Sequence, residues 1–437
     1  MQVSVEATGG LERRITVQVP AERIEKEIDD RLKSLTRTAR VAGFRPGKVP
    51  FKVIERKYGA QVRQEVLGEV VQSSFYEAVA QEKLRPAGGP KIEAGKVEPG
   101  QNLEYSATFE VYPEIHLASL EGVSIERPVA EVTDEDVERV INTLRKQRVT
   151  WNEVDRPGQN EDRLVIDFEG LIEGAPFPGN TGKQVALVLG SGSFIPGFEE
   201  QLIGARAGEQ RTFDVQFPDD YPAKEVAGKQ VRFQVNVSSV SEPQLPEVDE
   251  SFAKSFGISD GSVQSLRDEV RQNMRRELDQ TIRNKVKQQV MDALLEKNKI
   301  DLPSALVEQE IDQLIAQAQE QFRDPARRQN LSLPRSLFEE QARRRVALGL
   351  IIGEVIKANE IKLDQARVRQ MVEGLASTYE HPEEVVNWYY SNRNLLSGIE
   401  ALVLEEQVVD LLLQQMNVTD TPTEFDSLMN PGRNPQA

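Results

Sequence analysis

The first part of the chain, residues 1–112, switches between the periodicities that distinguish strands from helices. Near its start apolar and polar residues alternate, which predicts half-buried strands that Pro20 ends. Apolar residues then recur every three or four positions until the pattern stops at Gly43, which predicts an amphipathic helix. The predicted elements are strands over 3–5 and 15–19, helices over 21–41, 51–59 and 60–82, and closing strands between 92 and 111. Together they predict an α+β domain.

A connector, residues 113–149, leads into a segment of different character. Thr133 precedes an acidic amphipathic stretch and is the predicted N-cap of a helix that ends near Arg148. From 150 to 242, short apolar runs alternate with turns rich in Gly and Pro, which is typical of a compact β-rich domain. Its strands are predicted at 162–168, 184–189, 211–217 and 230–240.

The helical period returns beyond Pro246, and residues 243–418 predict an all-helical domain. Apolar residues from Val263 to Leu294 predict one helix of about 35 residues, roughly 50 Å long at about 1.5 Å per residue. Pro303 interrupts the pattern, and Ser304 is the predicted cap of the next helix. Helices are predicted near 304–322, 335–358, 364–379 and 395–416. The tail, 419–437, has little to bury and is predicted to be disordered.

The predicted fold class is therefore multidomain α+β: an N-terminal α+β domain, a central β-rich domain and a C-terminal all-helical domain. Long helices with one apolar stripe bury little on their own, so they pair in hairpins or leave apolar surface for another chain. A plain helical scaffold and a body with long binding arms both fit this pattern.

Composition removes many classes of chemistry. The 437 residues include no cysteine and two histidines, His116 and His381, which excludes disulfides and thiolate catalysis and leaves little room for a histidine triad or zinc site. We expect no metal and no cofactor. No apolar stretch approaches the roughly 18 residues of a membrane span, and the N-terminus lacks the features of a signal peptide. These features predict a cytoplasmic protein without a membrane partner.

Charge is distributed unevenly along the chain. The net charge of −17 argues against DNA binding, which needs clustered Lys and Arg. Residues 1–112, however, hold 18 basic and 16 acidic side chains, net +2, whereas the other 325 residues carry −19. Residues 31–57 contain nine Lys or Arg and one acid, Glu55, a local charge of +8. At a Debye length of about 8 Å such a patch acts at its own contact surface, so a basic tip on an acidic protein is expected.

The basic segment contains the loop Gly43-Phe44-Arg45-Pro46-Gly47-Lys48-Val49-Pro50. Its glycines and prolines predict a rigid turn between two basic helices that holds an aromatic ring and a guanidinium outward. Phosphate attracts Arg45 and Lys48, and Phe44 can fill an apolar crevice or stack on a base. The alternative is an ordinary helix connector with Phe44 tucked into the core, and the residues alone leave both open.

The loop also resembles a known signature. Gly-Phe-Arg-x-Gly-Lys-x-Pro is similar to the ribosome-binding motif of trigger factors, and the order of the domains is similar too. The resemblance implies docking on protein and RNA of the large ribosomal subunit near the exit tunnel. The implied docking residues are Gly43, Phe44, Arg45, Pro46, Gly47 and Lys48. Pro46 stands where some members carry a basic residue, so the resemblance implies one RNA contact fewer here. Nascent and unfolded polypeptides are the implied partners, with a homodimer considered for the protein off the ribosome.

The middle domain resembles prolyl isomerases of the FK506-binding-protein type. The resemblance rests on dispersed motifs, above all Phe194-Ile195-Pro196-Gly197-Phe198-Glu199, and it implies a single apolar pocket. The implied lining is Phe168, Phe177, Ile195, Phe198, Tyr221 and Phe233. The alternative is that these side chains form only the core of a small barrel-like sheet. Val185 stands where an aromatic residue is common, and Pro178 where an acidic one is usual.

An apolar pocket suits prolyl isomerisation because rotation about the amide breaks no covalent bond, although its barrier is about 18–20 kcal/mol. We therefore expect a ribosome-associated chaperone that binds nascent chains at the exit tunnel, delays their misfolding and has peptidyl-prolyl cis-trans isomerase activity. Two alternatives are kept: a stand-alone prolyl isomerase with substrate-recruiting domains, and a periplasmic-type helical chaperone.

Overall fold

The computed structural model shows two compact units. One unit contains residues 1–127 and 284–420, and the other contains 128–283 together with the C-terminal residues from 421. The structure describes residues 1–42, 44, 48–95, 100–221, 223–320, 333–377, 379 and 381–430. No helix within these ranges is long and apolar enough to cross a membrane.

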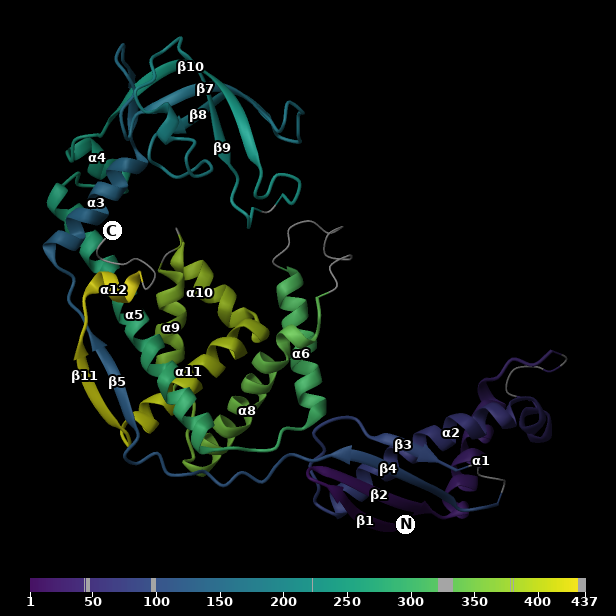
Figure 1. The fold of residues 1–437 in the computed structure, drawn as a ribbon. Coiled ribbons are helices and arrows are strands. Elements are labelled where there is room, and N and C mark those ends of the chain that lie inside the picture. The colour runs from purple at the N-terminus through teal and green to yellow at the C-terminus, as the bar shows by residue number, and fades with distance from the viewer. Residues whose placement is uncertain are drawn as a thin grey trace. The chain divides into compact units, whose positions relative to one another are not determined.

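The N-terminal domain is a four-stranded antiparallel sheet, in the order β1-β2-β4-β3, covered by two helices (Figure 1). Its elements are β1 (Gln2–Gly9), β2 (Glu12–Val19), α1 (Ala21–Thr38), α2 (Phe51–Gln81), β3 (Lys91–Ala94) and β4 (Leu103–Glu110). The alternating residues Ile15, Val17 and Val19 of β2 are fully buried, as their period of two requires. They pack with the apolar stripes of both helices in one core, so the predicted α+β domain has formed.

Helix α2 differs from the prediction, which placed one helix over 51–59 and another over 60–82. The helix is continuous because the buried positions continue past Gly59, and their packing outweighs the low helix propensity of a single glycine. The buried residues Ile54, Val62, Val66 and Val70 keep a helical spacing on both sides of this glycine. Residues 96–99, which include part of the predicted closing strands, lie outside the described residues.

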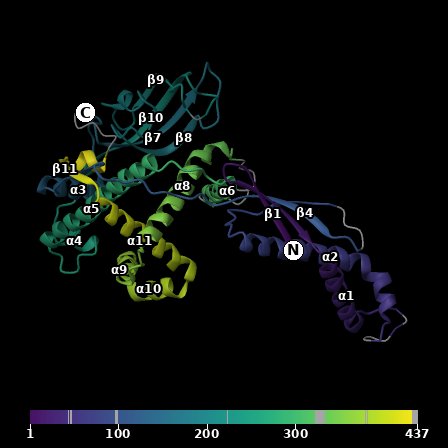
Figure 2. The same cartoon turned by 90° about the horizontal axis from the view of Figure 1, so that it is seen from below.

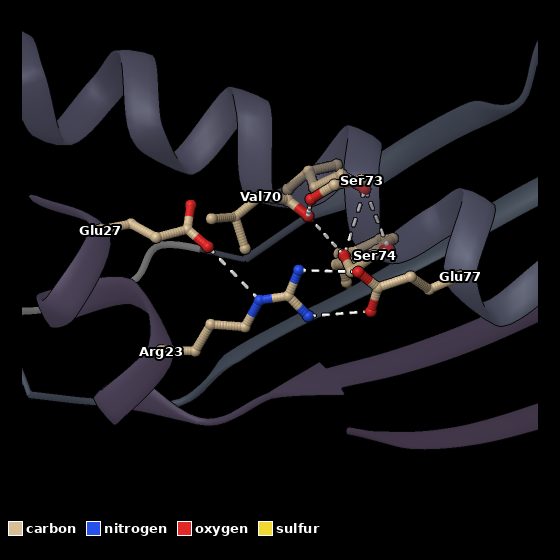
Figure 3. Close-up of polar contacts among 8 residues, drawn as sticks. Arg23, Glu27, Val70, Ser73, Ser74 and Glu77 are labelled. Carbon is tan, nitrogen blue, oxygen red and sulfur yellow. Dashed lines mark hydrogen bonds and ion pairs between the residues drawn. The ribbon is translucent and has the colours of Figure 1, made fainter. Parts of the chain in front are cut away.

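An ion pair joins the start of α1 to the end of α2 (Figure 3). Both terminal nitrogens of Arg23 donate to the two carboxylate oxygens of Glu77 at 2.9 Å, and its Nε donates to Glu27 at 3.5 Å. The hydrogen bond from Arg23 lowers the pKa of Glu77. Nearby, the buried hydroxyls of Ser74 and Tyr105 lie 2.8 Å apart and link α2 to the sheet. These contacts fix the base of the helix pair, whose other end carries the loop at 43–50.

The second unit holds a five-stranded antiparallel sheet in which β6, β10, β7 and β8 are neighbours and β9 pairs with β10. Its strands are β6 (Thr150–Glu153), β7 (Arg163–Leu171), β8 (Thr181–Val188), β9 (Gln210–Gln216) and β10 (Gln230–Gln244), with a short helix η1 (Glu200–Leu202). The four predicted strands are confirmed within a few residues, and β6 is an addition. Apolar side chains from these strands and from Phe198 and Leu202 fill one core.

Three helices accompany this sheet: α3 (Asp134–Gln147), α4 (Glu250–Ser255) and the first part of α5 (Val263–Lys297). The predicted N-cap of α3 is confirmed as a capping box, in which Thr133 Oγ1 accepts from Asp136 N at 3.2 Å and Asp136 accepts from Thr133 N at 2.8 Å. Helix α5 has the 35 residues that its apolar repeat predicts.

The prediction of a disordered tail is wrong for residues 419–430. Strand β11 (Asn417–Pro422) pairs with β5 (Ser124–Val129), and helix α12 (Phe425–Met429) follows. Asp420 accepts from Arg127 Nε at 2.7 Å, and Phe425 packs against the cluster that α3, α4 and α5 form. A strand needs a partner rather than an apolar core of its own, so local composition does not reveal it. Residues 431–437 lie outside the described residues.

We expect Phe425→Ala to destabilise the second unit by about 1–3 kcal/mol, because the ring is half-buried against that cluster. Thermal unfolding monitored by circular dichroism measures the change. Ser427→Ala, at an exposed position of the same helix, is the matched control. Equal melting curves for the two variants would mean that the tail contributes no packing energy.

The helical part of the first unit contains two packed groups. Its helices are α6 (Ser304–Glu320), α8 (Ser336–Ala358), α9 (Gln365–Ala376), α10 (Pro382–Ser391) and α11 (Arg393–Leu413). Helices α6 and α8 pack through one apolar cluster, and α9, α10 and α11 lie side by side around another (Figures 1 and 2). Helix α10 is an addition to the prediction. The hydroxyl of Ser304 does not cap α6; it donates to Glu110 at 2.7 Å, and the same carboxylate accepts from Ala305 N at 3.3 Å.

Candidate functional site

The sheet of the second unit has a cavity of about 430 Å³ beside it. Its lining is Phe168, Phe177, Gly179, Ser193, Phe194, Ile195, Pro196, Phe198, Phe217, Pro218, Tyr221 and Phe233. All six residues that the resemblance implied, from five separate segments of the chain, are brought together here. Phe198 and Phe233 also belong to the core cluster of this sheet, and Phe168, Phe177 and Ile195 pack against it, so the same side chains form part of the core and border the cavity.

The base of the cavity is a network of aromatic rings around Phe198, which is fully buried. Its ring stacks on Phe194 with centroids 4.9 Å apart and meets Phe233 edge to face at 5.0 Å. Phe168 lies at 6.2 Å from the same ring, also edge to face. Such pairs add directional preferences to apolar burial, so each ring holds its neighbours in place. The cavity is therefore a fixed surface rather than a loose gap between side chains.

Two glycines in the neighbouring strands make room for these rings. A Cβ atom on Gly170 would lie 2.7 Å from a ring carbon of Phe233, and one on Gly182 would lie 2.4 Å from a ring carbon of Phe168. Both distances are shorter than carbon atoms tolerate. The sequence Asp167-Phe168-Glu169-Gly170 thus contains Phe168, which lines the cavity, and Gly170, which leaves room for the ring of Phe233.

The chemistry available in the cavity is limited. Among the lining residues that the structure describes, the polar side chains are the hydroxyls of Ser193 and Tyr221, and the others are apolar or glycine. Such a lining favours burial of an apolar ring. Val185 packs against the core behind the cavity, and neither it nor Pro178 is a lining residue.

Glu199 is a buried acid behind the cavity wall, and sequence reasoning gave it no role of its own. Only 6% of its surface is exposed, and its carboxylate accepts from Gly192 N at 3.1 Å and from Phe194 N at 3.2 Å. Burial by itself raises the pKa of a carboxyl group, but these hydrogen bonds and one from Ser191 outweigh it and lower the pKa of Glu199.

The second candidate site is the loop at 43–50. Phe44 is 41% exposed, so the alternative that tucks its ring into the core is wrong. Lys48 is exposed too, whereas the next residue, Val49, is buried in the domain core and anchors the loop. The other predicted docking residues, Gly43, Arg45, Pro46 and Gly47, lie outside the described residues.

The predicted basic patch divides into paired and unpaired cations. Arg31 pairs with Glu69 at 3.2 Å, and Lys33 pairs with Asp29 at 2.9 Å, so two of the nine cations in 31–57 are already neutralised by acids outside that segment. The exposed cations without an ion pair to any residue the structure describes are Arg37, Arg40, Lys48, Lys52, Arg56 and Lys57. The available positive charge lies around the loop rather than along the whole helix pair.

Comparison with known proteins decides the family. Residues 1–144 match the family model "Bacterial trigger factor protein (TF)", and residues 262–414 match its C-terminal counterpart. The trigger factor of Thioalkalivibrio sulfidiphilus is 51% identical over 431 residues, which cover 99% of this chain and 98% of that protein. The chain belongs to the trigger factor family. A second trigger factor, from Pseudomonas fluorescens, is 50% identical over 437 residues and the full length of both chains.

Between the two trigger factor matches, residues 155–238 match the model of the FKBP-type peptidyl-prolyl cis-trans isomerase. This match confirms the family resemblance of the middle domain, and it spans β7, β8, β9, the first part of β10 and the whole cavity lining. The predicted fold class of this trigger factor family member is confirmed as well. The domain boundaries predicted near 112, 149 and 242 stay predictions.

The helical part of this family member exposes aromatic residues that sequence reasoning did not single out. Tyr379 is 60% exposed, Trp388 56% and Tyr390 44%, and helix α10 has no buried residue. The run Trp388-Tyr389-Tyr390 on a short helix was the available signal, because three successive aromatic residues cannot all face one core. The segment 379–390 therefore exposes three large aromatic side chains to solvent.

Proposed function

We propose that this chain is a ribosome-associated chaperone of the cytoplasm that holds nascent and unfolded polypeptides and isomerises their prolyl bonds. The observation that carries the isomerase part is the aromatic cavity of the FKBP-type segment. Its volume of about 430 Å³ lies in the usual range for small-ligand pockets and admits a prolyl side chain with its neighbours.

The cavity accelerates rotation by binding the twisted amide better than either planar isomer. Twisting reduces the charge separation of the amide, so the twisted form loses less from a dry apolar surface than the planar forms do. Phe168, Phe198 and Phe233 supply that surface, and the Tyr221 hydroxyl is within the lining to bond a peptide carbonyl. The test is the cis-to-trans rate of a short prolyl peptide with the full-length protein, and an uncatalysed rate would contradict the proposal.

The ribosome part rests on the loop at 43–50. An exposed aromatic ring among cations without acidic partners fits a contact with ribosomal protein and RNA of the large subunit, beside the exit tunnel. Co-sedimentation with ribosomes across a salt series tests this. Phosphate contacts release counterions, so binding should weaken steeply with added salt. A homodimer off the ribosome stays a prediction.

The exposed rings of the helical part are the proposed client surface. We expect Tyr379→Ser with Trp388→Ser to require about two- to fivefold more chaperone for equal suppression of aggregation of an unfolded protein, because both rings are more than half exposed and offer contact area to a client. The control is Tyr76→Ser, since Tyr76 of α2 is 61% exposed. Equal losses from both variants would show that exposed aromatic area alone, rather than this surface, holds clients.

Membership of the trigger factor family favours this proposal over a stand-alone prolyl isomerase and over a periplasmic-type helical chaperone. The three family matches together cover the N-terminal, middle and helical parts, so the isomerase segment is one domain of a multidomain trigger factor.

A further inference from the structure

Residues 191–196 form one wall of the cavity, and four of them line it: Ser193, Phe194, Ile195 and Pro196. This wall belongs to neither a helix nor a strand. It lies between Gly190 and Gly197, whose φ angles of +81° and +89° are in the left-handed region. A connection of this kind has no ladder of backbone hydrogen bonds to fix it, so its position depends on individual contacts.

Those contacts converge on one carboxylate. Oε1 of Glu199 accepts from Phe194 N at 3.2 Å and from Ser191 Oγ at 3.3 Å, and Oε2 accepts from Gly192 N at 3.1 Å. Ser191 Oγ in turn lies 2.9 Å from Ser193 Oγ. Both oxygens of the buried group are therefore directed at the back of the wall, and neither borders the cavity.

The same short segment also attaches the wall through its rings. Phe198 precedes Glu199, and its buried ring stacks on Phe194 at 4.9 Å. Phe194 is thus held by its backbone N–H on one side and by its ring on the other. Phe198 and Glu199 together therefore fix the position of Phe194. Through these contacts the wall is attached to the base of the cavity.

We propose that Glu199 is a positioning residue for prolyl isomerisation: it holds the wall at 191–196 in the conformation that accepts a prolyl segment. The proposal rests on the isomerase function proposed above. When the wall is ordered before binding, no entropy is lost in ordering it as the peptide binds. Without Glu199, the anchor of the wall, only a fraction of the molecules keeps the ordered wall. The apparent dissociation constant of the peptide then rises by the inverse of that fraction. The bound state, once formed, keeps the same aromatic surface.

A carboxylate is suited to this role and an amide is not. Two of the three partners are backbone N–H groups, which can only donate, and they face different carboxylate oxygens, so a glutamine in either orientation would turn its NH₂ group towards one of them. A buried donor that faces another donor costs about 1–3 kcal/mol. Glu199→Gln therefore changes the wall while it preserves the size and shape of the side chain.

The test compares Glu199→Gln with Glu200→Gln in the full-length protein. Glu200 is the next residue, is exposed and has no recorded hydrogen bond to the wall, so this control removes the same charge without the same contacts. For a short prolyl peptide we expect Glu199→Gln to raise KM about tenfold with kcat within about twofold of wild type, and Glu200→Gln to change neither. Unchanged KM in Glu199→Gln, or an equal rise in both variants, would overturn the proposal.

A second measurement does not depend on catalysis. Amide hydrogen exchange of peptides that cover 190–197 should be about tenfold faster in Glu199→Gln than in wild type, while exchange in the strands β7 and β10 stays unchanged. If the wild type does not isomerise the peptide, the proposed function fails, but faster exchange still supports the anchor. Equal exchange at 190–197 contradicts the anchor whatever the activity.

Should Glu199→Gln unfold the domain, Ser191→Ala gives the milder version of the same test. It removes the hydroxyl that donates to Oε1 and leaves both backbone bonds. We then expect a rise in KM of about two- to threefold with a matching increase in exchange at 190–197. No change in either quantity would count against Glu199 as the anchor.

Discussion

Phe198→Ala lowers kcat/KM for a short prolyl peptide by about 100-fold and leaves suppression of client aggregation intact. The ring is fully buried at the centre of the cavity floor and contacts Phe194 and Phe233. Its removal leaves a void where the twisted amide would rest, and a loss of about 3 kcal/mol in transition-state binding corresponds to a rate change of that size. Parallel assays of peptide isomerisation and aggregation on one preparation measure both effects.

The same ring supports the fold, so the loss of activity needs a stability control. Phe177→Ala removes a half-buried lining residue at smaller cost to folding, and we expect it to lower the isomerisation rate too. Phe256→Ala, in the same unit but in the cluster of α3, α4 and α5, is the matched control away from the cavity. If aggregation suppression fell together with isomerisation in variants that remain folded, the two activities would share one site and the proposed division would be wrong.

Phe44→Ala combined with Arg45→Ala abolishes co-sedimentation with ribosomes while peptide isomerisation stays at the wild-type rate. Phe44 is the exposed aromatic residue of the loop, and its truncation removes apolar contact area at the centre of the proposed contact. The loop lies in the first unit and the cavity in the second, so the variant should separate docking from catalysis. Undiminished sedimentation of the double variant would refute the docking loop.

The split between paired and unpaired cations sharpens this test. Arg37→Gln with Arg40→Gln removes two exposed charges that have no ion pair to any residue the structure describes, and it should reduce the salt dependence of ribosome binding by a slope of about two. Arg31→Gln with Lys33→Gln removes the same formal charge, but these side chains already pair with Glu69 and Asp29. We expect the second variant to bind more tightly than the first at equal salt.

Much of this architecture follows from periodicity. The 35 residues of α5 and the strands of the middle sheet were predictable because each buries one face, and burial imposes a repeat on the sequence. The capping box at Thr133 was predictable for the same local reason. The cavity lining came from resemblance rather than from periodicity, since its residues lie on five segments that only the fold brings together.

The features that sequence reasoning missed depend on distant partners or on backbone geometry. Helix α10 has only ten residues, and two half-buried side chains, Val386 and Tyr389, face its cluster, which is too short a repeat to indicate a helix. Glu110 caps α6 from almost two hundred residues away in the chain, and nothing near Ser304 indicates it. Glu199 could be recognised as a motif residue, but its acceptor role appears only when the N–H groups of Gly192 and Phe194 are located.

The pairing of β5 with β11 has a consequence for how the protein is itself made. The ion pair between Arg127 and Asp420 joins residues 293 positions apart, and Phe425 completes a cluster whose other members lie between Val132 and Met274. At synthesis rates of about 5–20 residues per second, β11 is synthesised about 15–60 s after β5. During that interval the N-terminal domain has all of its own strands and helices, while the last-made residues are still absent. This chain is therefore expected to emerge from the ribosome with its docking domain finished first and its own unpaired strand exposed until translation ends.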